Sequence, residues 1–289
     1  MFSAEEKLCD ALCLFEMTSE VYEACFFTLH VAVTTVACIA FTLYVSPLIN
    51  ARLNPNFFNL PVETQVGCNS RVTTFVYSAV ACFGSIYVLS SQVNTLEDFI
   101  RGPATWAAVF NATCVCGYCL SDAYFFVRYR ENLVGSVLVH HVIVIVSVFI
   151  GNLYFDVWWF YTSLRLLTEF STPFLVAQVT MKAFEMTRRG FYFVNGILTI
   201  VFYFVARILF IPVCYWILYV ASKTPSYTSL SVGAKLSCFI PLVFMDILNF
   251  VWFLQLIAIA RKAFSWHVWD VNSAIPIASN EAERTLRQT

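Results

Sequence analysis

Ionisable side chains of types that could do chemistry interrupt otherwise apolar stretches of the chain. They are Asp122, His140, His141, Arg165, Glu169, Arg207 and Asp246. A neutral histidine beside a carboxylate is a competent general base, and histidine can also act as a nucleophile toward an activated acyl group. The set is compatible with acyl-transfer chemistry, with lipid or ligand binding, and with hydrogen bonds that only hold helices together.

Helical geometry predicts how these groups meet. Adjacent residues project about 100° apart, so His140 and His141 cannot do the same job. Arg165 and Glu169 are four residues apart and close enough to pair on one helix. Counting ~1.5 Å per residue from the cytosolic helix ends places Arg207 and Asp246 at similar depths, beyond ~20 Å, and predicts an ion pair between them.

The amino-acid composition indicates that these helices lie in a membrane. The chain has 289 residues, of which 60% are hydrophobic and only 12% charged, whereas soluble domains are about 25% charged. This excludes a soluble enzyme and a disordered chain. The net charge of −1 leaves no basic field for nucleic acid, so no nucleic-acid partner is expected.

Apolar stretches predict an all-α, polytopic membrane bundle of about seven helices, because a spanning helix needs ~20 mainly apolar residues. The predicted spans are 24–44, 72–91, 103–127, 135–155, 157–179, 191–220 and 236–260. The fourth and fifth spans form a tight hairpin around Asp156. Pro212 is expected to kink the long sixth span or end its buried part. Residues 1–20 could form a short amphipathic helix.

Basic residues predict the orientation of the bundle. Eleven of the 17 Lys and Arg residues fall on the side of the C-terminus and four on the other. The C-terminus is therefore expected in the cytosol. Trp158, Trp159, Trp266 and Trp269 stand at span ends, which is typical of an interfacial aromatic belt.

Other function classes fit less well. Cys114, Cys116 and Cys119 point in different directions on a helix and lack a completing histidine, so no metal site is predicted. A seven-helix receptor would match the span count and orientation but not the charged pattern of spans four to six. A transporter would be expected to show paired broken helices in an inverted repeat, and the sequence has none.

The residues between 66 and 262 resemble the TLC-domain family, which includes the ceramide synthases. The resemblance rests on Gly117-Tyr118 with Asp122, on His140-His141, on the run from Leu166 to Phe174, and on two later groups. The later groups are Arg207-Ile208 with Ile211-Pro212, and Asp246-Ile247 with Asn249 and Trp252. The closest branch is the small TLC-domain-containing proteins. The chain then divides into an N-terminal segment with a first span (1–65), a TLC domain (66–262) and a cytosolic tail (263–289).

The resemblance implies six core helices around a central polar cavity, with the first span at the periphery. In ceramide synthases an acyl group passes from acyl-CoA to a sphingoid amine beside a double histidine, which His140 and His141 match. Glu169 and Ser171 keep an acid and a hydroxyl of the synthase motif, but its histidine and second aspartate are absent here.

The resemblance also implies a role in membrane lipid homeostasis, in the endoplasmic reticulum membrane, with membrane lipids and fatty-acyl chains as partners and no cofactor. The alternative is a ceramide-synthase-like N-acyltransferase with acyl-CoA as co-substrate. Its catalytic residues would be His140, His141, Glu169 and Asp122. Residues expected to line the cavity or bind lipid are Arg165, Ser171, Arg207, Asp246, Asn249 and Tyr118. Oligomeric state stays open.

Overall fold

The structure is a computed structural model that describes residues 19–129, 135–188 and 190–286. These residues form helices and turns, and no strand occurs among them. The prediction of an all-α chain is therefore confirmed. The amphipathic segment predicted over 1–20 lies almost wholly outside the described residues.

Seven helical runs follow one another along the described chain, several of them built from helices joined end to end. They are α2 (Ser19–Ala40) with η1 (Phe41–Val45) and α3 (Ser46–Leu53), α4 (Val62–Ser91), α6 (Trp106–Tyr129), α7 (Gly135–Ser147) with η3 (Val148–Tyr154), α8 (Trp159–Leu166) with η4 (Leu167–Ser171) and α9 (Thr172–Ala183), α10 (Gly190–Tyr203) with η6 (Phe204–Leu209) and α11 (Phe210–Ala221), and α13 (Val232–Leu286). Short helices stand in the connections: η2 (Phe57–Asn59), α5 (Asp98–Arg101), η5 (Met186–Arg188) and α12 (Pro225–Thr228).

Five helices of the described chain are long and apolar enough to cross a membrane. They are Ala24–Leu53, Val62–Ser91, Gly135–Tyr154, Gly190–Ala221 and Val232–Lys262. The other two predicted spans fall on α6 and on α8–η4–α9. The first is rich in small and polar residues, and the second is divided by its η4 segment. The protein is thus a polytopic membrane helical bundle, while the number of seven crossings stays a prediction.

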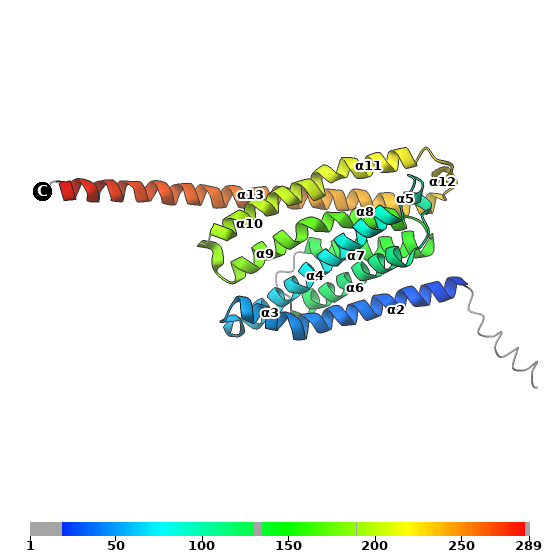
Figure 1. The fold of residues 1–289 in the computed structure, drawn as a ribbon, viewed down its shortest axis with the longest axis horizontal. Helices are drawn as coiled ribbons and strands as arrows, with labels where there is room; N and C mark the ends of the chain where they lie inside the picture. Colours follow the sequence, from blue (N-terminus) through cyan, green and yellow to red (C-terminus); the bar gives the residue numbers. More distant parts are fainter. Residues whose placement is uncertain (1–18, 130–134, 189, 287–289) are drawn as a thin grey trace, which may run out of the picture.

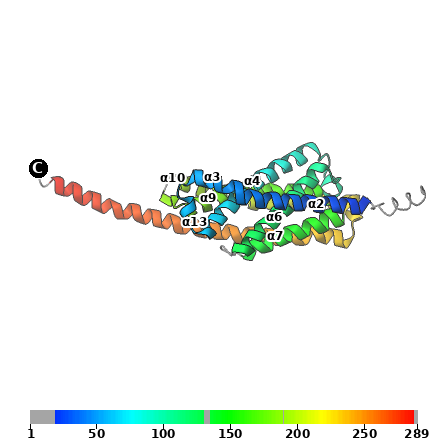
Figure 2. The same ribbon diagram turned by 90° about the horizontal axis from the view of Figure 1, so that it is seen from below.

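Six of the runs lie side by side (Figure 1), and their contacts close into a ring. Around the ring, α4 contacts α6, α6 contacts α7, α7 contacts α13, α13 contacts α10 and η6, α10 contacts α9, and α9 returns to α4. The first run stands outside this ring, with α2 against α6. Turning the molecule shows α2 along one side of the bundle and α13 projecting far beyond its end (Figure 2). A six-helix arrangement with a peripheral first helix matches what the family resemblance implies.

The middle of α6 is buried on all sides. Every residue from Asn111 to Cys119 is buried. A side-chain bond from Asn111 Nδ2 to Ser85 Oγ (2.9 Å) ties α6 to α4. On the opposite side, a Cβ added at Gly117 would lie 2.6 Å from Thr34 Cβ of α2. Gly117 therefore lets α2 approach closely, as small residues do between membrane helices.

Three core runs depart from α-helical geometry, two of them in their middle and the run of α7 at its end. Both η3 and η6 are π-helical, and η4 is a 3₁₀ segment. The sixth predicted span is continuous over Gly190–Ala221, and its irregularity is η6 rather than a break at Pro212. Proline has no N–H to donate to the carbonyl of Ile208, and the π turns that precede Pro212 accommodate this loss.

The predicted tight connection is present between η3 and α8, although α8 then packs on α4, α5 and α6 rather than on α7. Its turn places Asp156 (φ 48°) and Trp158 (φ 70°) in the left-handed region, which costs a non-glycine residue energy. Buried contacts hold the turn: the Trp158 N–H donates to Ile100 O (2.9 Å) and Trp158 Nε1 donates to Ala234 O (2.8 Å).

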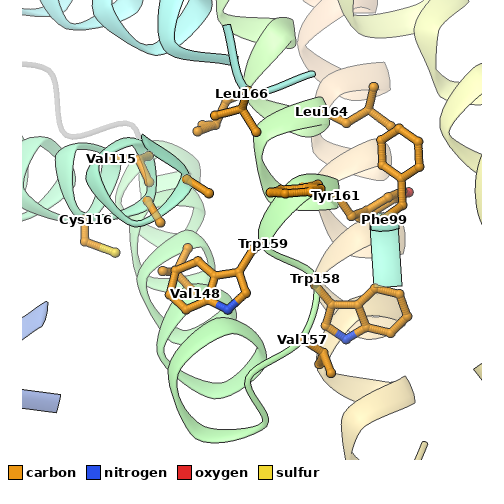
Figure 3. Close-up of a cluster of buried hydrophobic side chains, with 14 of the residues drawn as sticks. Phe99, Val115, Cys116, Val148, Val157, Trp158, Trp159, Tyr161, Leu164 and Leu166 are labelled. Carbon is orange, nitrogen blue, oxygen red and sulfur yellow. The ribbon is translucent and has the colours of Figure 1, made fainter. Parts of the chain in front are cut away.

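Trp158 and Trp159 are not interfacial, so the predicted aromatic belt is wrong for this pair. Each is only 3% exposed. Figure 3 shows both indoles inside a cluster with Val148, Val157 and Tyr161. The αL turn directs the chain inward, because the following helix α8 lies against α4, α5 and α6 rather than on the surface of the bundle. The side chains of Trp266 and Trp269 lie outside the described part of the chain.

Candidate functional site

A cavity of about 580 Å³ occupies the centre of the six-helix ring. Its wall includes residues of every run in the ring, among them Tyr77 of α4, Tyr118 of α6, Glu169 of η4 and Arg207 of η6. Along α13 the wall extends from Ser237 to Ile259, a rise of ~33 Å at ~1.5 Å per residue. The cavity therefore follows the bundle axis over most of the thickness of a bilayer.

Asp122 and His141 approach each other at one side of this cavity. His141 Nε2 lies 3.7 Å from Asp122 Oδ2, and both side chains are buried. Ser70 Oγ of α4 donates to Asp122 Oδ1 at 2.5 Å. Asp122 stands behind His141, which lines the cavity. Three helices thus bring Ser70, Asp122 and His141 together, with a hydrogen bond between the first two and a longer contact between the last two.

Aromatic rings pack around these three residues. Tyr118 stacks on Tyr77 with ring centroids 3.9 Å apart, and its hydroxyl is 2.9 Å from Thr74 Oγ1. The rings of Tyr118 and His141 meet edge to face, with their centroids 5.9 Å apart. These contacts fix the position of the His141 ring from the α4 and α6 side.

His140 faces a different neighbour, as its 100° offset from His141 requires. Its ring lies 5.5 Å from that of Trp252 on α13, and Trp252 Nε1 donates to Ser136 Oγ at 3.2 Å. Both histidines line the cavity. In each of them Nδ1 is buried and has no hydrogen-bond partner among the described residues. Because each Nδ1 has almost no accessible surface, neither of these two atoms is open to the cavity.

Arg207 is the most extensively bonded side chain of the site. Its Nε donates to Ser171 Oγ (3.0 Å), and Nη1 donates to Asn249 Oδ1 (3.1 Å). Nη2 donates to Glu169 Oε1 (3.3 Å) and to Thr172 Oγ1 (3.0 Å). Thr172 Oγ1 in turn donates to Glu169 Oε2 at 2.6 Å. The guanidinium thereby joins η4, η6 and α13.

A second ion pair lies further along α13. Arg165 Nη2 donates to Asp246 Oδ1 at 2.6 Å. Asp246 is three residues before the Arg207 partner Asn249, so this pair is ~4.5 Å further from the C-terminal end of α13. Arg165 lines the cavity, whereas Asp246 stands behind the wall.

The two predicted pairings, Arg165 with Glu169 and Arg207 with Asp246, are therefore wrong. The 3₁₀ segment η4 begins at Leu167, and 3₁₀ helices turn ~120° per residue instead of ~100°. Between Arg165 and Glu169 this doubles the angular offset to ~80°, so the two side chains no longer share a face. The π-helical turns around Arg207 likewise break the uniform rise that the depth count assumed.

Of the predicted site residues, the structure places Tyr118, His140, His141, Arg165, Glu169, Arg207 and Asn249 in the cavity wall. Asp122, Ser171 and Asp246 lie directly behind it, each bonded to a wall residue or within 4 Å of one. Sequence reasoning missed Ser70, Thr172 and Tyr77. Their signal was weak, because hydroxyl groups are common in membrane helices and only the three-dimensional contacts single these out.

Comparison with known proteins gives one family. A family model described as the TLC domain matches residues 68–258. The chain is 26% identical over 239 residues to TLC domain-containing protein 4-B of Xenopus laevis, covering 79% of this chain and 88% of the relative. It is 27% identical over 232 residues to human TLC domain-containing protein 4, with the same coverages. No solved structure matches the chain significantly.

The matched region includes parts of all six core runs and both ion pairs. The names of these relatives state the domain that they contain and no substrate. The chain belongs to the TLC domain family, a family of membrane proteins linked to lipid metabolism.

Proposed function

We propose that the protein acts in membrane lipid homeostasis by holding the hydrocarbon chain of a lipid in the central cavity. The observation that carries this proposal is the cavity itself, whose ~33 Å length along α13 suits an extended chain. Its volume of about 580 Å³ lies within the range of ligand pockets. A membrane lipid is the ligand that such a site meets at the highest concentration.

The distribution of polar groups supports the same proposal. Near the C-terminal end of the spanning part of α13 the wall carries Leu256 and Ile259, and at the other end it carries Pro241 and Leu242. The histidines and Arg207 lie between these ends. A chain can therefore lie in either apolar part while a polar group of the same molecule reaches the middle.

Orientation and location extend the proposal. Basic residues stand at one end of the bundle, where α3, α6 and α9 end and α4 begins. They are Arg52, Arg71, Arg128, Lys182, Arg188, Arg261 and Lys262. The positive-inside rule supports a cytosolic position for this end and for the C-terminus. The endoplasmic reticulum is proposed from the family resemblance, and fluorescence of a tagged full-length chain with organelle markers tests it.

Photo-crosslinking tests lipid binding. The full-length protein, in nanodiscs of phosphatidylcholine, is irradiated with a radiolabelled 18-carbon lipid that carries a diazirine in its chain. Met245→Trp adds an indole at a cavity-lining position of α13 and should reduce labelling several-fold. Phe244→Trp is the matched control, because Phe244 is 41% exposed and points away from the core. Equal labelling of wild type and Met245→Trp would refute the proposal.

A second function, N-acyl transfer, is favoured by the Asp122–His141 pair beside the cavity. In this reaction a lipid amine attacks the thioester carbonyl of acyl-CoA. His141 accepts the proton of the amine as the N–C bond forms, and the proton leaves with the thiolate as the C–S bond breaks. Glu169 does not act as the base in this proposal, because its carboxylate oxygens are bonded to Arg207 and Thr172.

Incubation of the purified protein with labelled acyl-CoA and a sphingoid base tests the transferase. Amide formation that disappears in His141→Ala and in His140→Ala would establish it. Unchanged cellular lipid profiles in both variants would exclude it and leave lipid binding in place.

A further inference from the structure

We infer that the cavity holds a single lipid chain with its terminal methyl group at the end where Gly151, Trp158 and Ser237 meet, and that these three residues limit the length of the chain. The inference rests on the proposed binding of a lipid chain. It adds the direction of the chain and the residues that select its length. Trp158 has a φ angle of 70°, and strained residues of this kind collect at functional sites.

The turn between η3 and α8 closes one end of the cavity. Every residue from Val157 to Phe160 is buried. Trp158, which lines the cavity, reaches α13 through the bond from its Nε1 to Ala234 O at 2.8 Å. Its indole also packs on Tyr227 of α12, with ring centroids 6.4 Å apart. A lipid chain therefore meets packed protein at this closed end.

The opposite end of the cavity is open. Its wall residues Val179 of α9 and Ile259 of α13 are 39% and 66% exposed. Three residues further along these two helices stand Lys182 and Lys262, at the basic end of the bundle. The opening therefore lies near the level of the polar head groups, and a lipid can keep its head group there while its chain extends inward.

The closed end has no hydroxyl donor to offer a head group. Three wall hydroxyls near it already donate within the protein: Ser147 Oγ to Val144 O (2.9 Å), Thr162 Oγ1 to Asn152 Oδ1 (3.0 Å) and Ser237 Oγ to Ala234 O (2.9 Å). Asn152 Nδ2 has no partner among the described residues, but it has almost no accessible surface. A head group placed here would lose its water without gaining these donors, whereas a hydrocarbon chain leaves the three bonds intact.

Gly151 and Ser237 give the closed end its depth. The φ angle of Gly151 is not positive, so its backbone conformation does not require glycine. A Cβ at this position would lie 3.3 Å from Trp158 Cδ1 and 3.4 Å from Ser237 Oγ. All three residues line the cavity. A larger side chain at position 151 or 237 would therefore occupy the space that the end of the chain needs.

Volume predicts the length that fits. At ~30 Å³ per non-hydrogen atom, the share of one water molecule in the liquid, 580 Å³ holds roughly 20 such atoms, which is one chain of about 18 carbons with a small head group. A longer chain would keep its additional methylene groups outside the wall, at the level of the head groups, where their burial is lost. Ser237→Phe adds about five non-hydrogen atoms and should shorten the best-fitting chain by about four carbons.

Two positions of one photoreactive group test the direction of the chain. 1-O-octadecylglycerol with a diazirine either at its terminal carbon or next to the glycerol is crosslinked to the full-length protein in phosphatidylcholine nanodiscs. Mass spectrometry then locates the labelled residues. We expect the terminal diazirine to label residues 148–162 and 234–242, and the other diazirine to label residues 172–179 and 252–259. The reverse pattern, or the same residues for both probes, would overturn the inference.

Chain length is tested with 1-O-alkylglycerols of 14, 18 and 22 carbons, each with a terminal diazirine. The 18-carbon probe should label wild type several-fold more than the 22-carbon probe. In Ser237→Phe and in Gly151→Val, labelling by the 18-carbon probe should fall several-fold while labelling by the 14-carbon probe is kept. Ile240→Phe is the matched control, because Ile240 lies on α13 with 60% exposure and outside the cavity wall.

The outcomes separate this inference from the proposed function. If no probe labels wild type above the Met245→Trp variant, lipid binding itself fails. If the probes label wild type but Ser237→Phe and Gly151→Val, both eluting as wild type, keep its preference for chain length, lipid binding stands and the inference is overturned. The location of the two diazirines is measured on wild type, so it decides the direction of the chain even where a variant does not fold.

Discussion

The Arg207 network and the Asp122–His141 pair are both buried ionisable clusters in one cavity wall, yet they differ in how completely their hydrogen bonds are made. Arg207 donates to four acceptors on three helical elements. His141 has one distant carboxylate neighbour and an Nδ1 atom without a partner among the described residues. The difference teaches that burial of a charged group does not mark it as functional. A completed network connects helices, whereas an incomplete one adds little to their association.

Of the substitutions that test this comparison, Arg207→Met should lower the stability of the protein most. The substitution leaves the Glu169 carboxylate buried without its cation. Three other acceptors of the guanidinium, on Ser171, Thr172 and Asn249, lose their donor. Removal of one partner of a buried ion pair costs about 3–5 kcal/mol. Thermal unfolding of the purified protein in detergent should show a large fall in midpoint. The double variant Glu169→Gln with Arg207→Met should recover part of the loss, and a single variant as stable as wild type would contradict the structural role.

Asp246→Asn should have a smaller effect, because the Arg165–Asp246 pair has a single short contact. Loss of a hydrogen bond between charged groups costs about 1.5–3 kcal/mol. The same thermal assay measures it, and combination with Arg165→Met should be far from additive since the two side chains are in contact. Additive losses would mean that the pair does not act as one unit.

Gly117→Ala tests how much close helix packing on α6 contributes to stability, apart from the polar contacts of Asp122 on the same helix. Its added methyl group would meet Thr34 of α2 at 2.6 Å. Overpacking of this kind costs about 1–3 kcal/mol. The matched control is Gly135→Ala, where a Cβ meets nothing within 4 Å. Equal melting of the two variants would show that α2 does not need this close approach.

His141→Phe should have the smallest effect on stability, below about 1 kcal/mol, because no short hydrogen bond is lost and the ring is replaced by one of similar shape. Its melting midpoint in the same thermal assay should stay near that of wild type. A loss as large as that of Arg207→Met would remove the distinction between the two clusters.

The sequence predicts the helical class and the family well, because twenty-residue apolar runs and the order of motifs such as His140-His141 need no tertiary information. It also predicts the neighbourhood of the site, since ionisable groups in apolar helices can be stable only together. The pairing of Arg165 with Asp246 and of Arg207 with Glu169 could not be predicted. Both depend on η4 and η6, whose hydrogen-bond pattern the apolar periodicity does not specify.

The buried turn illustrates a second limit. Two adjacent tryptophans at the end of an apolar run are typical of a membrane interface, and composition offers no reason to expect otherwise. Only the positive φ angles of Asp156 and Trp158 turn these rings inward. Such angles depend on contacts to Ile100 and Ala234, which are far away along the chain.

The π-helical segment η6 has a consequence for how this membrane helix can change by insertion or deletion. A π turn contains about one residue more than an α turn. Deletion of a single residue between Phe204 and Arg207 would allow α10 and α11 to join as one regular α-helix, at little cost in backbone bonding. Because the wider π turn absorbs the extra residue, the same deletion would leave α10 and α11 close to their present relative orientation. The change would be confined to the backbone around Arg207, which now donates to Glu169 from this segment, so one codon separates the present segment from a regular helix.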